Sequence, residues 1–126
     1  MINVRIVTPN GLYKETKASI INVRSTEGQR GILPNHMPLV LSLAIAKMEL
    51  QEEKREKYAV AGGMLHFKDN ECVILTPAIE HESEIDLERA KAAKERAQKH
   101  MNTEGSDYRR AELALKRAIN RISIKG

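Results

Sequence analysis

The first two thirds of the chain alternate short apolar stretches with turn-forming residues, which is typical of a β-rich fold. Residues 2–7 alternate apolar and polar side chains with a period of two, as a half-buried strand does. Further strands are predicted over residues 19–23, 39–45, 47–52, 56–61, 64–68 and 72–75. About seven short strands in about 80 residues predict an antiparallel sandwich or barrel.

Two dipeptides between predicted strands are of residue types that favour turns. Asp69 and Asn70 form a tight hairpin candidate, since both residues tolerate a left-handed backbone. Gly62 and Gly63 predict a bulge or a turn, because they lack the lysine and the helix of a phosphate-binding loop.

The last third of the chain has few breakers and many helix formers. Residues 83–86 predict a capping box at the start of a helix that runs to about Met101. A turn is predicted over residues 102–105, and Ser106 or Asp107 would cap a second helix ending near Ile122. One face of the first helix holds Asp86, Ala90, Ala93, Ala97 and His100, and the apolar stripe of the second holds Tyr108, Ala111, Leu115, Ala118 and Ile122.

The predicted fold class is therefore mixed β and α. An N-terminal antiparallel β-sandwich over residues 1–84 is followed by a C-terminal α-helical hairpin over residues 85–126. The alanines allow the two helices to approach closely. About 40 residues bury too little apolar area to be stable alone, so the hairpin must dock on the sandwich or on another protein.

The basic charge is confined to the hairpin. Residues 1–84 hold 10 Lys and Arg against 11 Asp and Glu, a balance of −1, whereas residues 85–126 hold 11 against 6, a balance of +5. On a helical wheel Arg110, Arg117 and Arg121 fall within about 40° of each other, and two further arginines share a face of the first helix, Arg89 and Arg96.

Two rows of arginines can converge on one anion, because a guanidinium binds phosphate oxygens bidentately. A nearby carboxylate, Asp86 or Glu80, could orient them. The alternative is a solvated face with pairs such as Glu112 and Lys116 four residues apart. Spacing favours the solvated face and leaves anion or nucleic-acid binding open.

Residues 31–39 form a shaped loop, because Pro34 and Pro38 prevent regular strand pairing. Its apolar side chains Ile32, Leu33 and Met37 are either core anchors or an exposed contact surface, and spacing does not decide between these.

We predict no catalytic residue and no metal site. The histidines form no H-x-x-x-H pair, and the single cysteine, Cys72, is expected to be a small buried hydrophobe. No apolar run reaches the roughly 18 residues of a membrane-spanning helix, and no leader is visible at the start. A cytosol-facing protein is the default expectation.

Four segments together resemble the epsilon subunit of bacterial F-type ATP synthase: residues 4–11, 31–39, 61–65 and 110–118. The resemblance implies a non-catalytic central-stalk subunit of the proton-translocating enzyme. Its sandwich would bind the gamma subunit and rest on the ring of c subunits. Its hairpin would inhibit ATP hydrolysis when extended into the alpha/beta catalytic head and permit turnover when folded. The protein would be peripheral, at the cytoplasmic face of the bacterial cell membrane, and would associate with the membrane only through the complex.

In some members of this family ATP holds the hairpin folded, through a motif similar to I/L-D-x-x-R-A, present here over residues 85–90. The resemblance therefore implies ATP as a regulatory ligand and no required cofactor. The implied ATP-binding residues are Glu80, Ile85, Asp86, Arg89, Ala90, Arg96, Arg117 and Arg121.

The resemblance also implies a docking surface for gamma or the c-ring at Glu27, Arg30, Leu33, His36 and Met37. One position departs from the family, which usually reads G-E-x-G before the loop. Here the acid is replaced by Gln29, so the contact would differ or be made by Glu27.

Two other functions remain as alternatives. A small basic module could bind nucleic acid through the hairpin, although the few aromatic residues count against stacking on bases. An amphipathic hairpin could lie on a membrane surface, although its stripe is largely alanine and offers few large apolar anchors.

Overall fold

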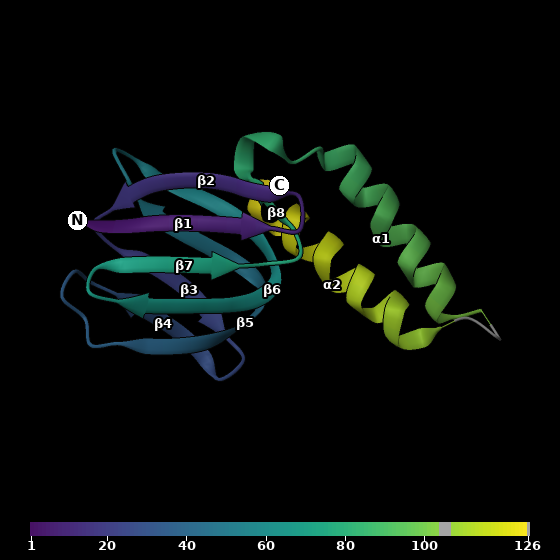
Figure 1. Ribbon diagram of the computed structural model, residues 1–126. Coiled ribbons are helices and arrows are strands. Elements are labelled where there is room, and N and C mark those ends of the chain that lie inside the picture. The colour runs from purple at the N-terminus through teal and green to yellow at the C-terminus, as the bar shows by residue number, and fades with distance from the viewer. Residues whose placement is uncertain (104–106, 126) are drawn as a thin grey trace.

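The computed structural model describes residues 1–103 and 107–125, which form eight strands, a 3₁₀ turn and two helices (Figure 1). The strands are β1 (Ile2–Thr8), β2 (Gly11–Ala18), β3 (Ile21–Ser25), β4 (Gly28–Ile32), β5 (Leu39–Gln51), β6 (Arg55–Lys68), β7 (Glu71–Leu75) and β8 (Ile79–His81). The 3₁₀ turn η1 (Glu82–Glu84) leads into the helices α1 (Leu87–Met101) and α2 (Tyr108–Lys125). The predicted fold class is confirmed.

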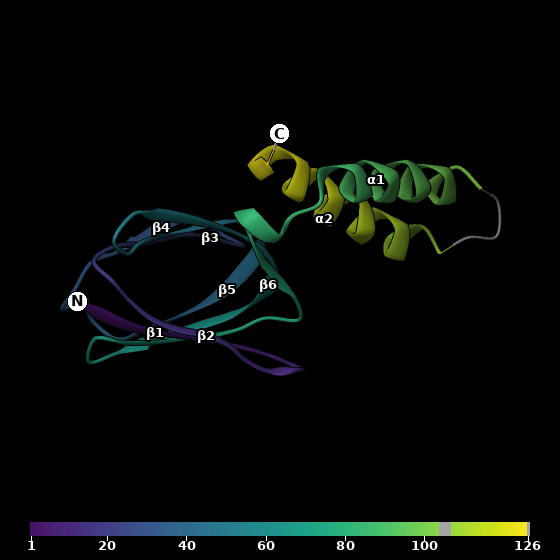
Figure 2. The same cartoon turned by 90° about the horizontal axis from the view of Figure 1, so that it is seen from above.

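The strands form one sheet that folds over into two layers (Figure 2). Its order is β2-β1-β7-β6-β5-β3-β4, and β8 adds to β6. The long strands β5 and β6 pair in one register from Leu39 opposite Phe67 to Gln51 opposite Arg55, and they connect the two layers. The pair β1–β7 is parallel, which departs from the antiparallel pairing expected throughout.

The structure corrects several strand predictions. Residues 39–45 and 47–52 belong to one continuous strand, β5, and residues 56–61 and 64–68 belong to β6. The strand expected over residues 19–23 is β3, shifted by two residues. Three strands were not predicted, β2, β4 and β8, because they are short or mostly polar and show no alternating pattern. The Asp69–Asn70 hairpin is confirmed, with positive φ angles of 50° and 60°.

Gly62 and Gly63 lie inside β6 at the point where that strand changes partner. β6 pairs with β7 up to Met64 opposite Leu75, and with β8 from Val60 opposite Ile79. The register with β5 continues past the glycines, so they form neither the turn nor the bulge that we expected. A Cβ on Gly63, at φ 114°, would lie 2.0 Å from the carbonyl oxygen of Leu75. Only glycine allows this close approach of two backbones.

The core lies between the two layers, where the largest fully buried side chains are Tyr58 and Phe67. Cys72 belongs to this core, as predicted. Its burial raises the pKa of the thiol to about 12, so the side chain stays protonated and unreactive at neutral pH.

The helices pack on each other through alanines, as predicted. Ala90, Ala97, Ala111 and Ala118 are all buried, whereas Tyr108, the first residue of the expected apolar stripe, is 57% exposed. The hairpin projects beside the sandwich, and α2 is the helix that meets β5 and β6 (Figure 2).

The helix caps differ in part from the prediction. Asp86 caps α1 by accepting the Arg89 backbone N–H at 3.1 Å, and Asp107 caps α2 by accepting that of Arg110 at the same distance. The capping box expected over residues 83–86 is wrong. His81 and Glu84 form a capping box around η1 instead, which ends one turn before α1 begins. Ser106 and residues 104–105 of the predicted connecting turn lie outside the described residues.

The close approach at Gly63 predicts a large cost for Gly63→Ala. We expect a loss of about 3 kcal/mol or more in the free energy of unfolding, because the methyl group clashes with backbone and the φ is strained. Gly28→Ala is the matched control, since Gly28 also has a positive φ but open space around it. It should lose only about 1–2 kcal/mol. Equal losses in denaturant unfolding would contradict the steric account.

Candidate functional site

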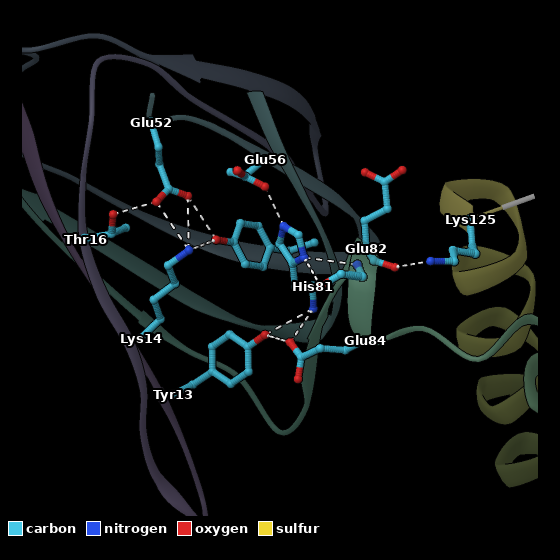
Figure 3. Close-up of polar contacts among 11 residues, drawn as sticks. Tyr13, Lys14, Thr16, Glu52, Glu56, His81, Glu82, Glu84 and Lys125 are labelled. Carbon is cyan, nitrogen blue, oxygen red and sulfur yellow. Dashed lines mark hydrogen bonds and ion pairs between the residues drawn. The ribbon is translucent and has the colours of Figure 1, made fainter. Parts of the chain in front are cut away.

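A network of polar side chains holds residues 79–84 against the sandwich, and we call it the polar clasp (Figure 3). Glu52 lies at one end of it. This carboxylate accepts hydrogen bonds from the hydroxyls of Thr16 at 2.6 Å and Tyr58 at 3.0 Å, and it pairs with Lys14 at 3.3 Å. Lys14 also donates to the Tyr58 hydroxyl at 2.6 Å. Side chains from β2, β6 and the β5–β6 turn are joined in this way.

His81 lies at the other end of the polar clasp. Its Nε2 is 2.5 Å from a carboxylate oxygen of Glu56, and its Nδ1 accepts the Ser83 backbone N–H at 3.0 Å. Its own backbone N–H donates to the Tyr13 hydroxyl oxygen at 3.1 Å and to Glu84 at 2.9 Å. The Tyr13 hydroxyl in turn donates to Glu84. The segment that leads to the hairpin is therefore fixed to β2 and β6.

The charges of the polar clasp are stabilised by these bonds. Hydrogen bonds from Tyr13 and from the His81 backbone hold the pKa of Glu84 below its usual value. Burial opposes ionisation of Glu52, but hydrogen bonds from Thr16, Tyr58 and Lys14 lower its pKa overall. Burial and the neighbouring carboxylates raise the pKa of both tyrosines. Both carboxylates are therefore ionised and both tyrosines protonated at neutral pH.

The hairpin is attached to the sandwich by a smaller contact, which we call the hairpin anchor. Arg121 of α2 donates from Nε to a carboxylate oxygen of Glu80 on β8 at 2.5 Å. Beside it, Ile85, Ala59 and Ile124 form a small buried cluster. Lys125 donates to the Glu82 carbonyl at 3.1 Å. One ion pair, one apolar cluster and one hydrogen bond therefore join α2 to residues 80–85 and β6.

Three of the predicted ATP-binding residues come together at the hairpin anchor. Glu80, Arg117 and Arg121 line one pocket between β6 and α2. The Nε of Arg117 is buried and has no hydrogen-bond partner among the residues that the structure describes. The anchor therefore contains one arginine paired with a carboxylate and a second with an unused donor, around a cavity of about 10 Å³ that has room for about one water molecule.

The other predicted ATP-binding residues have structural places or lie apart. Ile85 is buried in the anchor cluster, Ala90 is buried against α2, and Asp86 caps α1. Arg89 and Arg96 are exposed on α1.

The predicted row of arginines on α2 is divided between two places. Arg110 lies in a groove of about 560 Å³ between the two helices, together with Arg96 and His100, and not at the hairpin anchor. Arg110 and Arg121 share a helical face but are about 16 Å apart along it. Arginines that share one face of a helical wheel therefore do not all belong to one binding site.

The structure decides between the two interpretations of the apolar residues in the loop over residues 31–39. Ile32 is buried in the core, whereas Leu33 is 57% and Met37 74% exposed. Asn35 and Asn70 hydrogen-bond each other at 2.6 and 2.9 Å and hold the loop beside the β6–β7 turn. Figure 1 shows this end of the sandwich on the side away from the helices.

Of the remaining docking candidates, His36 belongs to this loop, whereas Glu27 lies in the β3–β4 turn at the other end of β4 and Arg30 lies in the middle of that strand. Glu27 and Arg30 are exposed. His36 is partly buried, and its ring meets Phe67 edge-on at 6.0 Å between ring centres. The end of the sandwich therefore presents apolar side chains on a braced loop, as a contact surface requires.

Sequence reasoning missed the polar clasp. Tyr13, Lys14, Glu52, Tyr58 and His81 come from segments far apart in the chain, and no local spacing connects them. Residues 1–103 and 107–125 contain no group of three side chains placed to hold a metal ion. Within the same residues, neither helix is long and apolar enough to cross a membrane.

Comparisons with known families match the whole chain. Residues 1–82 match the family model described as ATP synthase, Delta/Epsilon chain, beta-sandwich domain. Residues 83–126 match the one described as ATP synthase, Delta/Epsilon chain, long alpha-helix domain.

Individual relatives agree with the family models. The chain is 41% identical to the ATP synthase epsilon chain of Bacillus pumilus and 40% identical to that of Halalkalibacterium halodurans. Each alignment covers 99% of this chain and 97% of the relative. A chain in the Euglena gracilis mitochondrial ATP synthase structure, solved with OSCP, F1 and the c-ring, has a TM-score of 0.75 at 26% identity. That alignment covers 91% of this chain and 75% of the other.

The lowered pKa of Glu84 predicts a pH-dependent contribution to stability. A lowered folded pKa stabilises the fold above the ordinary carboxyl value, about 4.3, and this stabilisation is lost as the pH falls through the lowered value. Glu84→Gln should therefore lower the free energy of unfolding at neutral pH and converge with the parent chain in acid. Glu82→Gln is the control, because the carboxylate of Glu82 takes no part in the polar clasp (Figure 3). A constant difference across pH in denaturant unfolding would contradict this.

Proposed function

The chain belongs to the delta/epsilon family of ATP synthase subunits, and we propose that its hairpin is a movable regulator of ATP hydrolysis. Its relatives are epsilon chains, a non-catalytic subunit of the complex. In this proposal the hairpin permits turnover while it lies on the sandwich and inhibits hydrolysis when it extends into the alpha/beta catalytic head. The hairpin anchor carries the proposal, because it is the small contact that such a movement must break.

The hinge of this movement lies at Ile85 and Asp86, which divides the chain into a docking domain and a regulatory domain. Residues 79–84 are held by the polar clasp, and Asp86 is the cap that begins α1. Ile85 has an extended backbone between η1 and that cap. Extension of the hairpin would separate Arg121 from Glu80 and expose Ile124, and the polar clasp would stay intact.

ATP is the proposed ligand of the folded hairpin. Its phosphates would meet Arg117 and Arg121 at the hairpin anchor, where the cavity of about 10 Å³ would have to widen to admit them and would then expose the unused donor of Arg117. Arg89 would reach the same phosphates from α1, which requires its exposed side chain to turn toward α2. Arg96 lies beside Arg110 in the other groove and would have to reach along the hairpin. A ligand that binds only the folded state shifts the equilibrium toward it.

The end of the sandwich away from the helices is the proposed contact surface for the rotor. Leu33 and Met37 would meet the c-ring, with His36 beside them, and the gamma subunit would hold the side of the sandwich. A solved relative is part of a structure that includes F1 and the c-ring. The protein would then be peripheral, at the cytoplasmic face of the bacterial membrane, and part of the machinery of proton transport and ATP synthesis.

ATP should protect the hairpin of the free chain from a protease that does not cleave at lysine or arginine. We expect Arg89→Ala to raise the ATP concentration needed for protection by about tenfold or more, the effect of losing one charged hydrogen bond. Lys91→Ala is the matched control, because it removes an exposed cation from the same helix.

Two outcomes would limit the proposal. Equal cleavage with and without ATP would remove the role of ATP and leave the stalk role standing. An unchanged ATP requirement in Arg89→Ala would mean that the arginine has no part in binding.

A further inference from the structure

A second cleft lies between α2 and the sandwich, on a different face of α2 from the hairpin anchor. It has a volume of about 420 Å³. The helix contributes Lys116, Ile119 and Asn120, and strands β3, β4 and β5 contribute Arg24, Gln29 and Lys47. Lys116, Ile119 and Asn120 are spaced three and four residues apart, so they share one face of α2. This cleft exists only while α2 lies on the sandwich.

The cleft is lined by three cations, by neutral polar groups and by the apolar side chains of Ile45, Ala46 and Ile119. Arg24, Lys47 and Lys116 come from three different elements, and none of the residues that line the cleft is acidic. Lys47 and Lys116 each pair with a carboxylate outside it, Glu49 at 2.9 Å and Glu112 at 3.4 Å. Within the described residues, Arg24 forms no ion pair. Among the described residues that line the cleft, Arg24 is therefore the cation that no carboxylate neutralises.

We propose that this cleft binds a small phosphate-bearing anion that ties α2 to the sandwich. Arg24 offers a planar fork to phosphate oxygens, and Lys47 and Lys116 offer point charges from either side. The amide groups of Gln29 and Asn120 supply neutral donors. The anion screens the repulsion between lysines of the sandwich and of α2, so its binding favours the folded hairpin. This site goes beyond the proposed ATP site and shares none of its residues.

Gln29 allows the cleft to accept an anion. Its amide adds a donor and no charge, whereas a carboxylate of the same shape would place a negative charge among the three cations. Gln29→Glu therefore adds one negative charge to the cleft and changes almost nothing else. Because Gln29 is exposed on an edge strand, the substitution leaves the core untouched.

The test is a calorimetric titration of the full chain with inorganic pyrophosphate. We expect saturable binding, weakened about fivefold in Lys116→Gln, the upper range for one exposed ion pair. Gln29→Glu should weaken it at least as much. Gln98→Glu is the matched control, because it makes the same change at an exposed position of α1 and should leave affinity unchanged. Pyrophosphate should also slow proteolysis of the hairpin.

Other variants separate this site from the ATP site. Arg89→Ala should weaken ATP binding and leave pyrophosphate binding unchanged. A parent chain that binds pyrophosphate but not ATP would contradict the role of ATP in the proposed function and not this inference. The inference is overturned if pyrophosphate does not bind, or if Gln29→Glu and Lys116→Gln bind it as tightly as the parent chain. It is also overturned if Arg121→Gln abolishes binding and the two cleft variants do not, because the anion would then sit at the hairpin anchor.

Discussion

The ion pair between Glu80 and Arg121 decides where the hairpin lies. Both side chains are about one third exposed, and an exposed pair of this kind contributes about 1 kcal/mol or less. The apolar cluster beside it contains only Ile85, Ala59 and Ile124. The hairpin is therefore stable as a pair of helices but weakly fixed to the sandwich. A ligand or a partner that provides a few kcal/mol of differential binding can move it.

The polar clasp, in contrast to the hairpin anchor, is a strong attachment. Its hydrogen bonds involve partly buried and ionised groups. Tyr13 of β2 and Glu56 of β6 bond to His81, and the ring of Tyr58, which Glu52 and Lys14 hold, packs edge-on against the His81 ring. Charge-assisted bonds of this kind are stronger than neutral ones. A rigid segment next to a weak anchor confines movement to the residues between them. The fold thus separates a part that stays docked from a part that can change position.

Periodic features were predictable from the sequence, and contacts between distant segments were not. Alternation located β1, short stretches between turn signals located β3, β7 and parts of β5 and β6, and the alanine spacing gave the faces on which the helices meet. The edge strand β2 is polar and half exposed, so no pattern marked it. Arg110 shared a wheel face with Arg121 but lies in another groove, because a wheel ignores position along the axis. The polar clasp left no local signal, since its members meet only after the sandwich folds.

The central claim is that the hairpin anchor is a necessary part of the contact that holds the hairpin on the sandwich. Spin labels on cysteines introduced at Lys17 of β2 and Gln98 of α1 would report the distance between sandwich and hairpin. The buried Cys72 would stay unlabelled, because burial keeps its thiol protonated. In Arg121→Gln the account predicts a shift of the distance distribution without a change in the unfolding of the sandwich. An unchanged distribution in that variant would contradict it.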